Sequence, residues 1–469
     1  MHFSGLSFVV LSVLAWGAVG FDNTRYWGQN SRGASNPTEP ANYQKPISFY
    51  CQDDAIDVIP VAFLTKFFST GGLPEINLAN TCSNVDNGTF PGTSLANCQN
   101  LAADIKACQA KGKLVTLSLG GATGSVSFTG DDQAQAFADT IWNLFLGGSS
   151  STRPFGSAVL DGIDLDIESG TSTGYPALVN RIRSLASGAS KKYYVTAAPQ
   201  CVYPDAALGG VLNSASFDAI YVQFYNNPCG LQNFNSASKW NFGIWDYWAR
   251  NVSPNKDVKV YIGAPGSAGG AGGGYVSIST LSSIAVKMRQ SYPSFGGVML
   301  WDASQAYVNG RYDLGIKNAL KAAGGTGFTY PTCSAPAYVS GQPYTAGQQV
   351  SYNGYIWQPK WWTNTVPNHN SNGDWSEISA CQGSVTTTST GQQPTGGQCS
   401  GVPAWTSTAV FTGGQMAVYN GRLYKAKWWT QGDIPGTSAD GPWADSGACG
   451  GAKAKRERPR RNSRFFVAN

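Results

Sequence analysis

The fold is decided by the segment Asp161-Gly-Ile-Asp164-Leu-Asp166-Ile-Glu168. Side chains on a β-strand alternate between two faces, so the last three acids share one face and the apolar residues between them share the other. The apolar face predicts packing against helices, and the acidic face then looks into a barrel. In barrels of parallel strands, active sites lie at the carboxyl ends of the strands. We therefore expect Glu168 at that end.

Runs of β-branched or aromatic residues alternate with helical patterns on both sides of this segment. The predicted strands are Thr24–Trp27, Asp57–Leu64, Leu114–Leu119, Gly162–Ile167, Tyr193–Ala198, Ala219–Tyr225, Lys259–Ala264 and Gly297–Trp301. The predicted helices include 95–110, 132–146, 175–186, 279–291 and 314–323. Eight such units favour an α/β fold, a closed (β/α)8 TIM barrel over residues 21–325. The pattern alone leaves an open doubly wound sheet as the alternative.

Three acids on one inner face are costly for folding. Carboxylates two residues apart on a strand are about 6.6 Å apart, and at an effective dielectric of 20 they repel by roughly 2.5 kcal/mol. This repulsion raises a carboxyl pKa and predicts one group that stays protonated near neutral pH. An exposed acidic strand or a calcium-binding loop is the alternative, but the apolar residues between the acids favour burial.

Several motifs of the barrel region resemble those of glycoside hydrolase family 18. The acidic segment has the family's DxxDxDxE signature, and Ser118-Leu-Gly120-Gly121 resembles its SxGG motif. Three further matching segments are Tyr26–Asn30, Tyr221–Pro228 and Val298–Trp301. Together they are similar to the plant and fungal class III chitinases, most of all to secreted or wall-associated fungal enzymes with carbohydrate-binding tails.

The resemblance implies hydrolysis of chitin in which the substrate itself takes part. Glu168 would protonate the glycosidic oxygen while the substrate's 2-acetamido oxygen attacks the anomeric carbon. Asp166 would stabilise the oxazolinium intermediate, Asp164 would tune Asp166, and Tyr225 would hydrogen-bond the acetamido oxygen. The residues implied in substrate binding are Tyr26, Gln223, Asn226, Trp301, Gly120 and Gly121. From the residues alone, Trp301 and Tyr225 are more simply interpreted as barrel packing.

A sequence rich in Trp, Tyr, Gly and Thr follows Gly324-Gly325 and contains an internal repeat. Tyr-Asn-Gly and Lys-Trp-Trp-Thr occur in both copies. Two small all-β modules are predicted, over 326–383 and 399–450, joined by a Thr/Ser/Gln/Gly-rich linker over 384–398. Units this small cannot bury so many large rings, so some rings must face solvent. The residues expected to bind chitin are Trp361, Trp362, Trp428, Trp429, Tyr352 and Tyr419.

These modules resemble chitin- or cellulose-binding modules of families 5 and 12. The first copy departs from the pattern, with Tyr338 where the second has Trp405 and with a longer loop over 364–372. Sugar binding by the first copy is therefore the weaker expectation. A structural or protein-binding repeat is the alternative for both.

Ten cysteines fit an oxidising compartment. Those of the repeat region bracket the two modules and predict the pairs Cys333–Cys381 and Cys399–Cys449. The six others leave 15 connectivities on sequence alone. The family resemblance implies Cys51–Cys108, Cys82–Cys98 and Cys201–Cys229. Because the sequence has neither a CxxC motif nor a Cys/His cluster, no metal site and no cofactor are expected.

The two ends of the chain have patterns of their own. An apolar run and a small-x-small site predict a signal peptide over residues 1–20. The basic tail, 451–469, carries a charge of +6, so the rest of the chain contributes −1 to the net charge of +5. The tail is interpreted as disordered, and no nucleic-acid partner is expected. Later apolar segments are too short to predict a membrane span. Asn87 and Asn251 begin glycosylation sequons.

Together these observations predict a secreted chitinase, extracellular or bound to the cell wall, that acts as a monomer on chitin and N-acetylglucosamine oligosaccharides with retention of configuration. Two other classes stay open. One is a catalytically inactive chitin-binding lectin or inhibitor, against which the presence of Glu168 and Asp166 argues. The other is an endo-β-N-acetylglucosaminidase acting on N-glycans, against which the two modules argue.

Overall fold

The computed structural model describes residues 23–324, 328–382, 399, 402–406, 409–436 and 441–449. The predicted signal peptide, the linker over 384–398 and the basic tail lie outside these residues. The chain forms two compact units, 1–386 and 387–469. The barrel and the first repeat thus belong to one unit and the second repeat to the other.

Eight parallel strands form the closed barrel that the sequence predicts. They are β1 (Asn23–Arg25), β2 (Val58–Lys66), β4 (Leu114–Gly120), β5 (Gly162–Asp166), β6 (Tyr194–Ala197), β7 (Ala219–Gln223), β8 (Lys259–Pro265) and β9 (Phe295–Trp301). The ring closes because β1 pairs with β9 on one side and with β2 on the other. An open sheet, the alternative that the pattern allowed, is therefore wrong.

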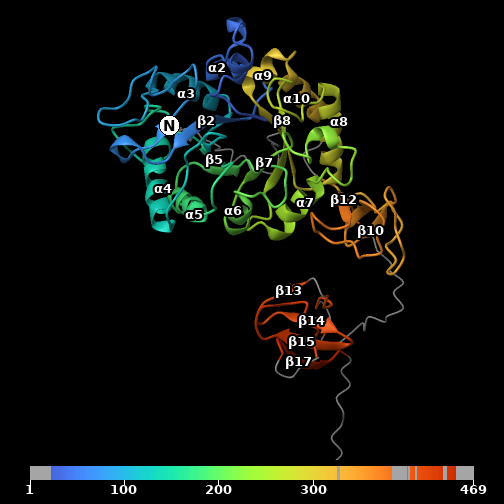
Figure 1. Cartoon of the computed structure of the whole chain (residues 1–469). Coiled ribbons are helices and arrows are strands. Elements are labelled where there is room, and N and C mark those ends of the chain that lie inside the picture. Colours follow the sequence, from blue (N-terminus) through green and yellow to red (C-terminus); the bar gives the residue numbers. More distant parts are fainter. Residues whose placement is uncertain are drawn as a thin grey trace, which may run out of the picture. The chain divides into compact units, whose positions relative to one another are not determined.

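Helices surround the ring of strands and cover its outer face (Figure 1). They are α1 (Ser31–Ser35), α2 (Ile47–Tyr50), α3 (Ala102–Ala110), α4 (Asp131–Phe145), α5 (Tyr175–Ala186), α6 (Gly209–Ser214), α7 (Phe242–Tyr247), α8 (Ile278–Ser291), α9 (Ala303–Val308) and α10 (Tyr312–Ala322). On α4 the buried residues recur at helical spacing and face the strands. Among the described residues, every helix is too short or too polar to cross a membrane.

Some element ends differ from the prediction for local reasons. The strand expected to reach Tyr225 ends at Gln223, and Asn226 then takes a left-handed backbone with φ of 58°. The helix expected from residue 95 begins at Ala102, because Cys98 is held by a disulfide and a 3-10 turn follows it. A short additional strand, β3 (Glu75–Ile76), pairs antiparallel with β2. These changes leave the order of the barrel strands intact.

The closing strand β1 is anchored by a buried ion pair at its end. The guanidinium of Arg25 lies 2.5 Å from a carboxylate oxygen of Asp313, and both side chains are almost fully buried. Asn23 Nδ2 donates to the backbone oxygens of Asp313 (2.9 Å) and Ala55 (2.7 Å). Removing one partner of such a pair leaves an uncompensated buried charge and costs about 3–5 kcal/mol. The first strand is thus tied to the last barrel helix, α10.

Each repeat is a small antiparallel sheet. The first contains β10 (Val350–Tyr352), β11 (Tyr355–Pro359) and β12 (Trp375–Ala380). The second contains β14 (Met416–Tyr419), β15 (Arg422–Ala426) and β17 (Trp443–Ala448), with a separate pair of β13 (Val410–Phe411) and β16 (Thr430–Gln431). The five disulfides join the cysteines as expected: Cys51–Cys108, Cys82–Cys98, Cys201–Cys229, Cys333–Cys381 and Cys399–Cys449.

Candidate active site

The three acids of strand β5 lie at increasing exposure along the barrel. Asp164 is fully buried, Asp166 is 4% exposed, and Glu168 is half-buried two residues beyond the end of the strand. This order places Glu168 at the carboxyl ends of the strands, which we call the mouth of the barrel. The strand therefore presents its outermost acid where a substrate can reach it.

Asp164 is the anchor of the site. Its carboxylate accepts hydrogen bonds from Tyr26 Oη (2.6 Å), Ser118 Oγ (2.7 Å) and Thr196 Oγ1 (2.7 Å). Burial raises the pKa of Asp164, and the three hydrogen bonds act in the opposite direction. Tyr26 is itself buried, and its hydroxyl donates to Asp164. In this structure its contact is with the buried aspartate, and its ring is not exposed at the mouth.

Asp166 and Glu168 have raised pKa values for related reasons. Burial and then the charges of Glu168, Asp164 and Asp205 raise the pKa of Asp166 well above its usual range. Burial and then the charge of Asp205 raise the pKa of Glu168. Gln223 opposes both shifts, and its Nε2 donates to Asp166 Oδ1 at 3.0 Å. A carboxyl group that keeps its proton at the mouth is suited to general acid catalysis.

Asp205 is a member of this acidic group that the sequence pattern does not single out. It lies in the turn after β6 and is 8% exposed. Its carboxylate accepts the backbone N–H groups of Gln200 (2.9 Å), Ala207 (2.9 Å) and Leu208 (2.6 Å). An aspartate after proline in a turn is typical of ordinary capping. The sequence pattern therefore does not indicate that Asp205 lies near Glu168. In the structure its charge raises the pKa of Glu168.

Aromatic rings line the acid-bearing inner face of the barrel. The cluster comprises Tyr26, Ala62, Phe63, Ala198, Ala219, Tyr221, Tyr225, Tyr261 and Met299, with Ala271 and Trp301 packed against it. Trp301 is partly exposed and stacks on Phe63, with ring centroids 5.7 Å apart and planes at 18°. Burial and the charges of Asp166 and Glu168 hold the pKa of Tyr225 well above its usual range, so its hydroxyl keeps its proton. Phe63 is a wall residue that sequence analysis missed.

The two predicted glycines permit close packing beside Asp166. Gly120 has φ of 111°, and a Cβ there would lie 2.3 Å from the backbone oxygen of Asp166. Gly121 donates its N–H to the same oxygen at 2.8 Å, and a Cβ on it would meet the ring of Phe63. Asn226 is exposed, and its Oδ1 accepts the N–H of Gly273 at 3.1 Å. These three residues shape the backbone around the acids.

The paired tryptophans of both repeats are exposed. The exposed fractions are 48% for Trp361, 61% for Trp362, 52% for Trp428 and 60% for Trp429. Large apolar rings left in solvent are available for stacking on sugars. The repeats' other predicted tyrosines are instead partly buried, Tyr352 against Tyr338 and Tyr419 against Trp405. The sequons Asn87 and Asn251 are exposed, and their glycosylation stays a prediction.

A closed barrel that has at its mouth a glutamic acid with a raised pKa, next to a buried aspartic acid, defines the class of (β/α)8-barrel proteins with a carboxyl-based site. The model of the glycosyl hydrolases family 18 matches residues 24–273, and the chain belongs to this family. The model of carbohydrate-binding module family 5/12 matches residues 404–444, within the second repeat.

Curated relatives are similar over the barrel. They include "Chitinase 2" of Rhizopus oligosporus, 50% identical over 313 residues, which are 66% of this chain and 54% of the relative. The "Endochitinase" of Saccharomyces cerevisiae is 43% identical, over 65% of this chain and 51% of its own length. The chain thus spans about half of these relatives. The "Class III chitinase" of Arthroderma benhamiae is 42% identical over 64% of this chain and 89% of its own length.

Solved structures of the same fold include proteins with different names. ICChI chitinase from Ipomoea carnea is 31% identical with a TM-score of 0.52, and covers 64% of this chain and 99% of its own. The xylanase and alpha-amylase inhibitor protein XAIP-II from Scadoxus multiflorus is 32% identical with a TM-score of 0.53 and the same coverage. Because a chitinase and an inhibitor protein share this fold, the function has to be argued from the site.

We expect Asp166→Asn to lower activity and raise stability together. If Asp166 stabilises a cationic intermediate, as the family resemblance implies, the change should cost about 10²-fold in kcat. A carboxyl with a raised folded-state pKa stabilises the fold at low pH and loses this contribution as pH rises through that pKa. The amide cannot ionise, so we expect Tm to rise by a few degrees at pH 7.

Kinetics on chitotetraose and thermal unfolding at two pH values check this expectation. The gain in Tm should shrink at pH 4, where the wild-type carboxyl is protonated in the folded state and only about half ionised in the unfolded state, so the acidic measurement is the internal control. Wild-type kcat in the variant would contradict the placement of Asp166. So would a gain in Tm over wild type that is smaller at pH 7 than at pH 4.

Proposed function

We propose that the chain is a chitinase that hydrolyses β-1,4-linked N-acetylglucosamine polymers with retention of configuration by substrate-assisted catalysis. The observation that carries the proposal is the position of Glu168 at the mouth, two residues beyond buried Asp166 at the end of β5, together with its raised pKa. Membership of family 18 and the similarity to proteins titled chitinases support the substrate class.

In the proposed first step, Glu168 gives its proton to the glycosidic oxygen and the bond from that oxygen to the anomeric carbon breaks. The substrate's 2-acetamido oxygen forms a new bond to the same carbon, giving an oxazolinium ion. Asp166 stabilises the positive charge, and the Tyr225 hydroxyl donates to the acetamido oxygen. Asp164 is fixed by three hydrogen bonds, and its charge helps to raise the pKa of Asp166.

In the second step, the Glu168 carboxylate takes a proton from water while the water oxygen attacks the anomeric carbon. The bond to the acetamido oxygen breaks, the oxazolinium ring opens, and the acid is restored. Trp301 is the apolar floor under the sugar in this scheme, and Gln223 orients both Asp166 and the acetamido group. The proposed scheme calls for no metal ion or cofactor.

Two rival functions make different demands on the same residues. A lectin or inhibitor needs no acid that keeps its proton, so the presence and pKa of Glu168 favour an enzyme. An endo-β-N-acetylglucosaminidase of N-glycans has no need of exposed Trp pairs for a polymer, and the match of residues 404–444 to a carbohydrate-binding module favours chitin.

We also propose the location and organisation of the protein. Five disulfides and two exposed sequons fit a secreted glycoprotein, extracellular or attached to the wall, whose signal peptide covers residues 1–20. The proposed order of parts is a catalytic barrel (21–325), a first module (326–383), a linker (384–398), a second module (399–450) and a basic tail (451–469). The monomeric state is proposed with them.

A substrate panel tests the proposed function. Chitotetraose, crystalline chitin and a glycoprotein with high-mannose N-glycans are incubated with the full chain, and products are measured by mass spectrometry. We expect short N-acetylglucosamine oligosaccharides from the first two and no glycan release from the third. Binding to chitin without cleavage would favour the lectin, and glycan release without chitin cleavage would favour the glycosidase of N-glycans.

A further inference from the structure

The first repeat is joined to the barrel by a buried network of polar contacts. Tyr355 Oη on β11 donates to Asp246 Oδ2 on α7 at 2.9 Å, and Arg250 pairs with the same carboxylate at 2.9 Å. Tyr292 Oη donates to the backbone oxygen of Glu377 on β12 at 2.9 Å. Asp246, Tyr292, Tyr355 and Glu377 are all buried. Polar groups buried across a contact with their partners in place fix one arrangement of the two surfaces.

Close packing accompanies this network. Gly243 on α7 faces β12, where a Cβ would lie 2.4 Å from the Cβ of Glu377. The ring of His369 stacks on Tyr247 with centroids 3.5 Å apart, and its Nδ1 lies 2.7 Å from Glu377 Oε1. The first repeat lies beside α7 in Figure 1. The contact therefore depends on the absence of a side chain at one position of the barrel.

The hydrophobic clusters distinguish the two repeats. Core residues of the first repeat, including Tyr338, Trp357 and Trp375, belong to the same continuous cluster as the barrel core. The second repeat has a cluster of its own around Phe411 and Trp443. By this measure the first repeat has no core separate from the barrel, whereas the second does.

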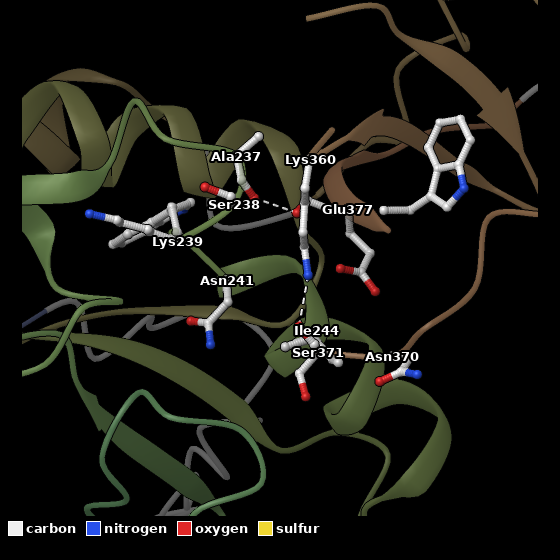
Figure 2. A pocket seen from close by; sticks show the side chains of 12 residues that line it. Ala237, Ser238, Lys239, Asn241, Ile244, Lys360, Asn370, Ser371 and Glu377 are labelled. Carbon is white, nitrogen blue, oxygen red and sulfur yellow. Dashed lines mark hydrogen bonds between the residues drawn. The ribbon is translucent and has the colours of Figure 1, made fainter. Parts of the chain in front are cut away.

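Figure 2 shows a polar pocket at this contact, lined from both sides. The barrel contributes residues 237–241, and the repeat contributes Lys360 with residues from β12 and the loop before it. Ser376 Oγ donates to the backbone oxygen of Ala237, and Lys360 Nζ donates to that of Ser371 at 2.7 Å. A volume of about 70 Å³ has room for a few water molecules. We call this pocket the seam of the contact.

The barrel side of the seam continues to the candidate active site. The segment over residues 224–241 has Tyr225 near its start at the mouth, and its last residues, 237–241, line the seam together with the first repeat. The disulfide Cys201–Cys229 holds its early part, and Asn241 Nδ2 donates to the backbone oxygen of Cys201 at 2.7 Å. The same braced segment therefore carries the hydroxyl proposed for catalysis and the surface on which the repeat rests.

We propose that the first repeat, residues 328–382, is a fixed extension of the barrel that holds Trp361 and Trp362 as a stationary aromatic platform for a chitin chain. The choice of ligand rests on the proposed function. Asp374 Oδ1 accepts the Trp361 indole N–H at 2.7 Å and sets the orientation of that ring. A ring held in place loses less entropy on stacking than a mobile one, and a platform fixed to the barrel presents the chain in one register.

Gly243→Glu in the full chain tests the proposal. The new side chain cannot fit against Glu377 and brings a like charge to it, so we expect the repeat to leave α7. Gly210→Glu is the matched control, because it adds the same charge at an exposed glycine of helix α6 where a Cβ makes only ordinary contact. Trp361→Ala/Trp362→Ala and Trp428→Ala/Trp429→Ala separate the roles of the two repeats.

Hydrogen exchange of peptides from α7 and β12 and hydrolysis rates on two substrates are the readouts. In wild type and Gly210→Glu we expect protected amides, and in Gly243→Glu faster exchange at both elements. We expect Gly243→Glu and the Trp361/Trp362 variant to lose about 5- to 10-fold of the rate on crystalline chitin, with hydrolysis of chitotetraose unchanged.

The outcomes separate the contact from the ligand. Free exchange of α7 and β12 in wild type, or a wild-type rate on crystalline chitin after the repeat is released, would overturn the proposal. An equal loss on chitotetraose and on crystalline chitin in Gly243→Glu would overturn it too, since the repeat would then serve only to support the barrel. If the wild-type chain failed to hydrolyse chitotetraose at all, the proposed function itself would fall.

Discussion

Replacing Glu168 with glutamine is expected to lower kcat on chitotetraose by about 10²- to 10⁴-fold, the usual contribution of a general acid. Glutamine has nearly the same shape, but it cannot give a proton to the departing oxygen. Folding should be retained, because the side chain is only half-buried. Burial and the nearby charge of Asp205 disfavour a negative charge at this position, and a neutral amide carries none.

Steady-state kinetics with thermal unfolding of the same samples measure this effect. Glu75→Gln is the matched control, since it is a half-buried glutamate of the same sheet whose carboxylate bonds Ser69 and Lys66 away from the acidic strand. Wild-type turnover by a well-folded Glu168→Gln variant would disprove the assignment, and equal losses in both variants would point to a general effect on the fold.

The pH dependence of the wild type follows from the same residue. A general acid works only in its protonated form, so activity should fall as pH rises through the raised pKa of Glu168. Asp205 contributes to that raised pKa, so Asp205→Asn should move the alkaline limb to lower pH. An unmoved limb would show that burial alone sets the pKa of the acid.

The second large effect concerns the substrate. If its acetamido oxygen is the nucleophile, cleavage requires an N-acetyl group on the sugar in the −1 subsite, and fully deacetylated chitosan and cellulose should resist the enzyme. Two inversions at the anomeric carbon, first by that oxygen and then by water, restore the original configuration. The first product should therefore be the β-anomer.

Proton NMR of fresh product from chitotetraose distinguishes the mechanisms before mutarotation. An initial α-anomer would mean that a protein base activates water directly. Rapid hydrolysis of fully deacetylated chitosan, with retention, would mean that a protein carboxylate attacks instead, and Asp166 would be the first residue to test for that role. Asp166→Asn would then abolish turnover rather than reduce it.

The sequence predicts the barrel and its acidic strand well because both depend on short-range rules. Alternation with period two places Asp164, Asp166 and Glu168 on one face, and burial of the residues between them fixes which face points inward. The closure of the ring by β1 has no such local signal, since it joins residues far apart in the chain. Eight repeated units make closure the favoured expectation, and the pairing itself is visible only in the structure.

Other parts of the site escape sequence analysis for physical reasons. Asp205 lies in a loop, outside any periodic pattern. Phe63 lies in a predicted strand, where simple alternation would place it on the face of Ile59 and Val61, but the register of β2 shifts between Ala62 and Leu64 and Phe63 joins the inner aromatic cluster. Tyr225 and Trp301 have the composition of ordinary packing, and only the family resemblance singles them out. The contact of the first repeat with α7 depends on Gly243, and a lone glycine in a helix carries no indication of what will fill the space beside it.

The ion pair of Arg25 with Asp313 also sets an order of events during synthesis. The two residues are 288 positions apart, and the strand that begins the barrel pairs with the strand that ends it. At 5–20 residues per second, about 15–60 s separate their emergence from the ribosome. For that time β1 lacks one neighbour, and its arginine lacks its counter-ion. The ring can close only when almost the whole barrel region has been made, so the nascent barrel stays open until late in translation.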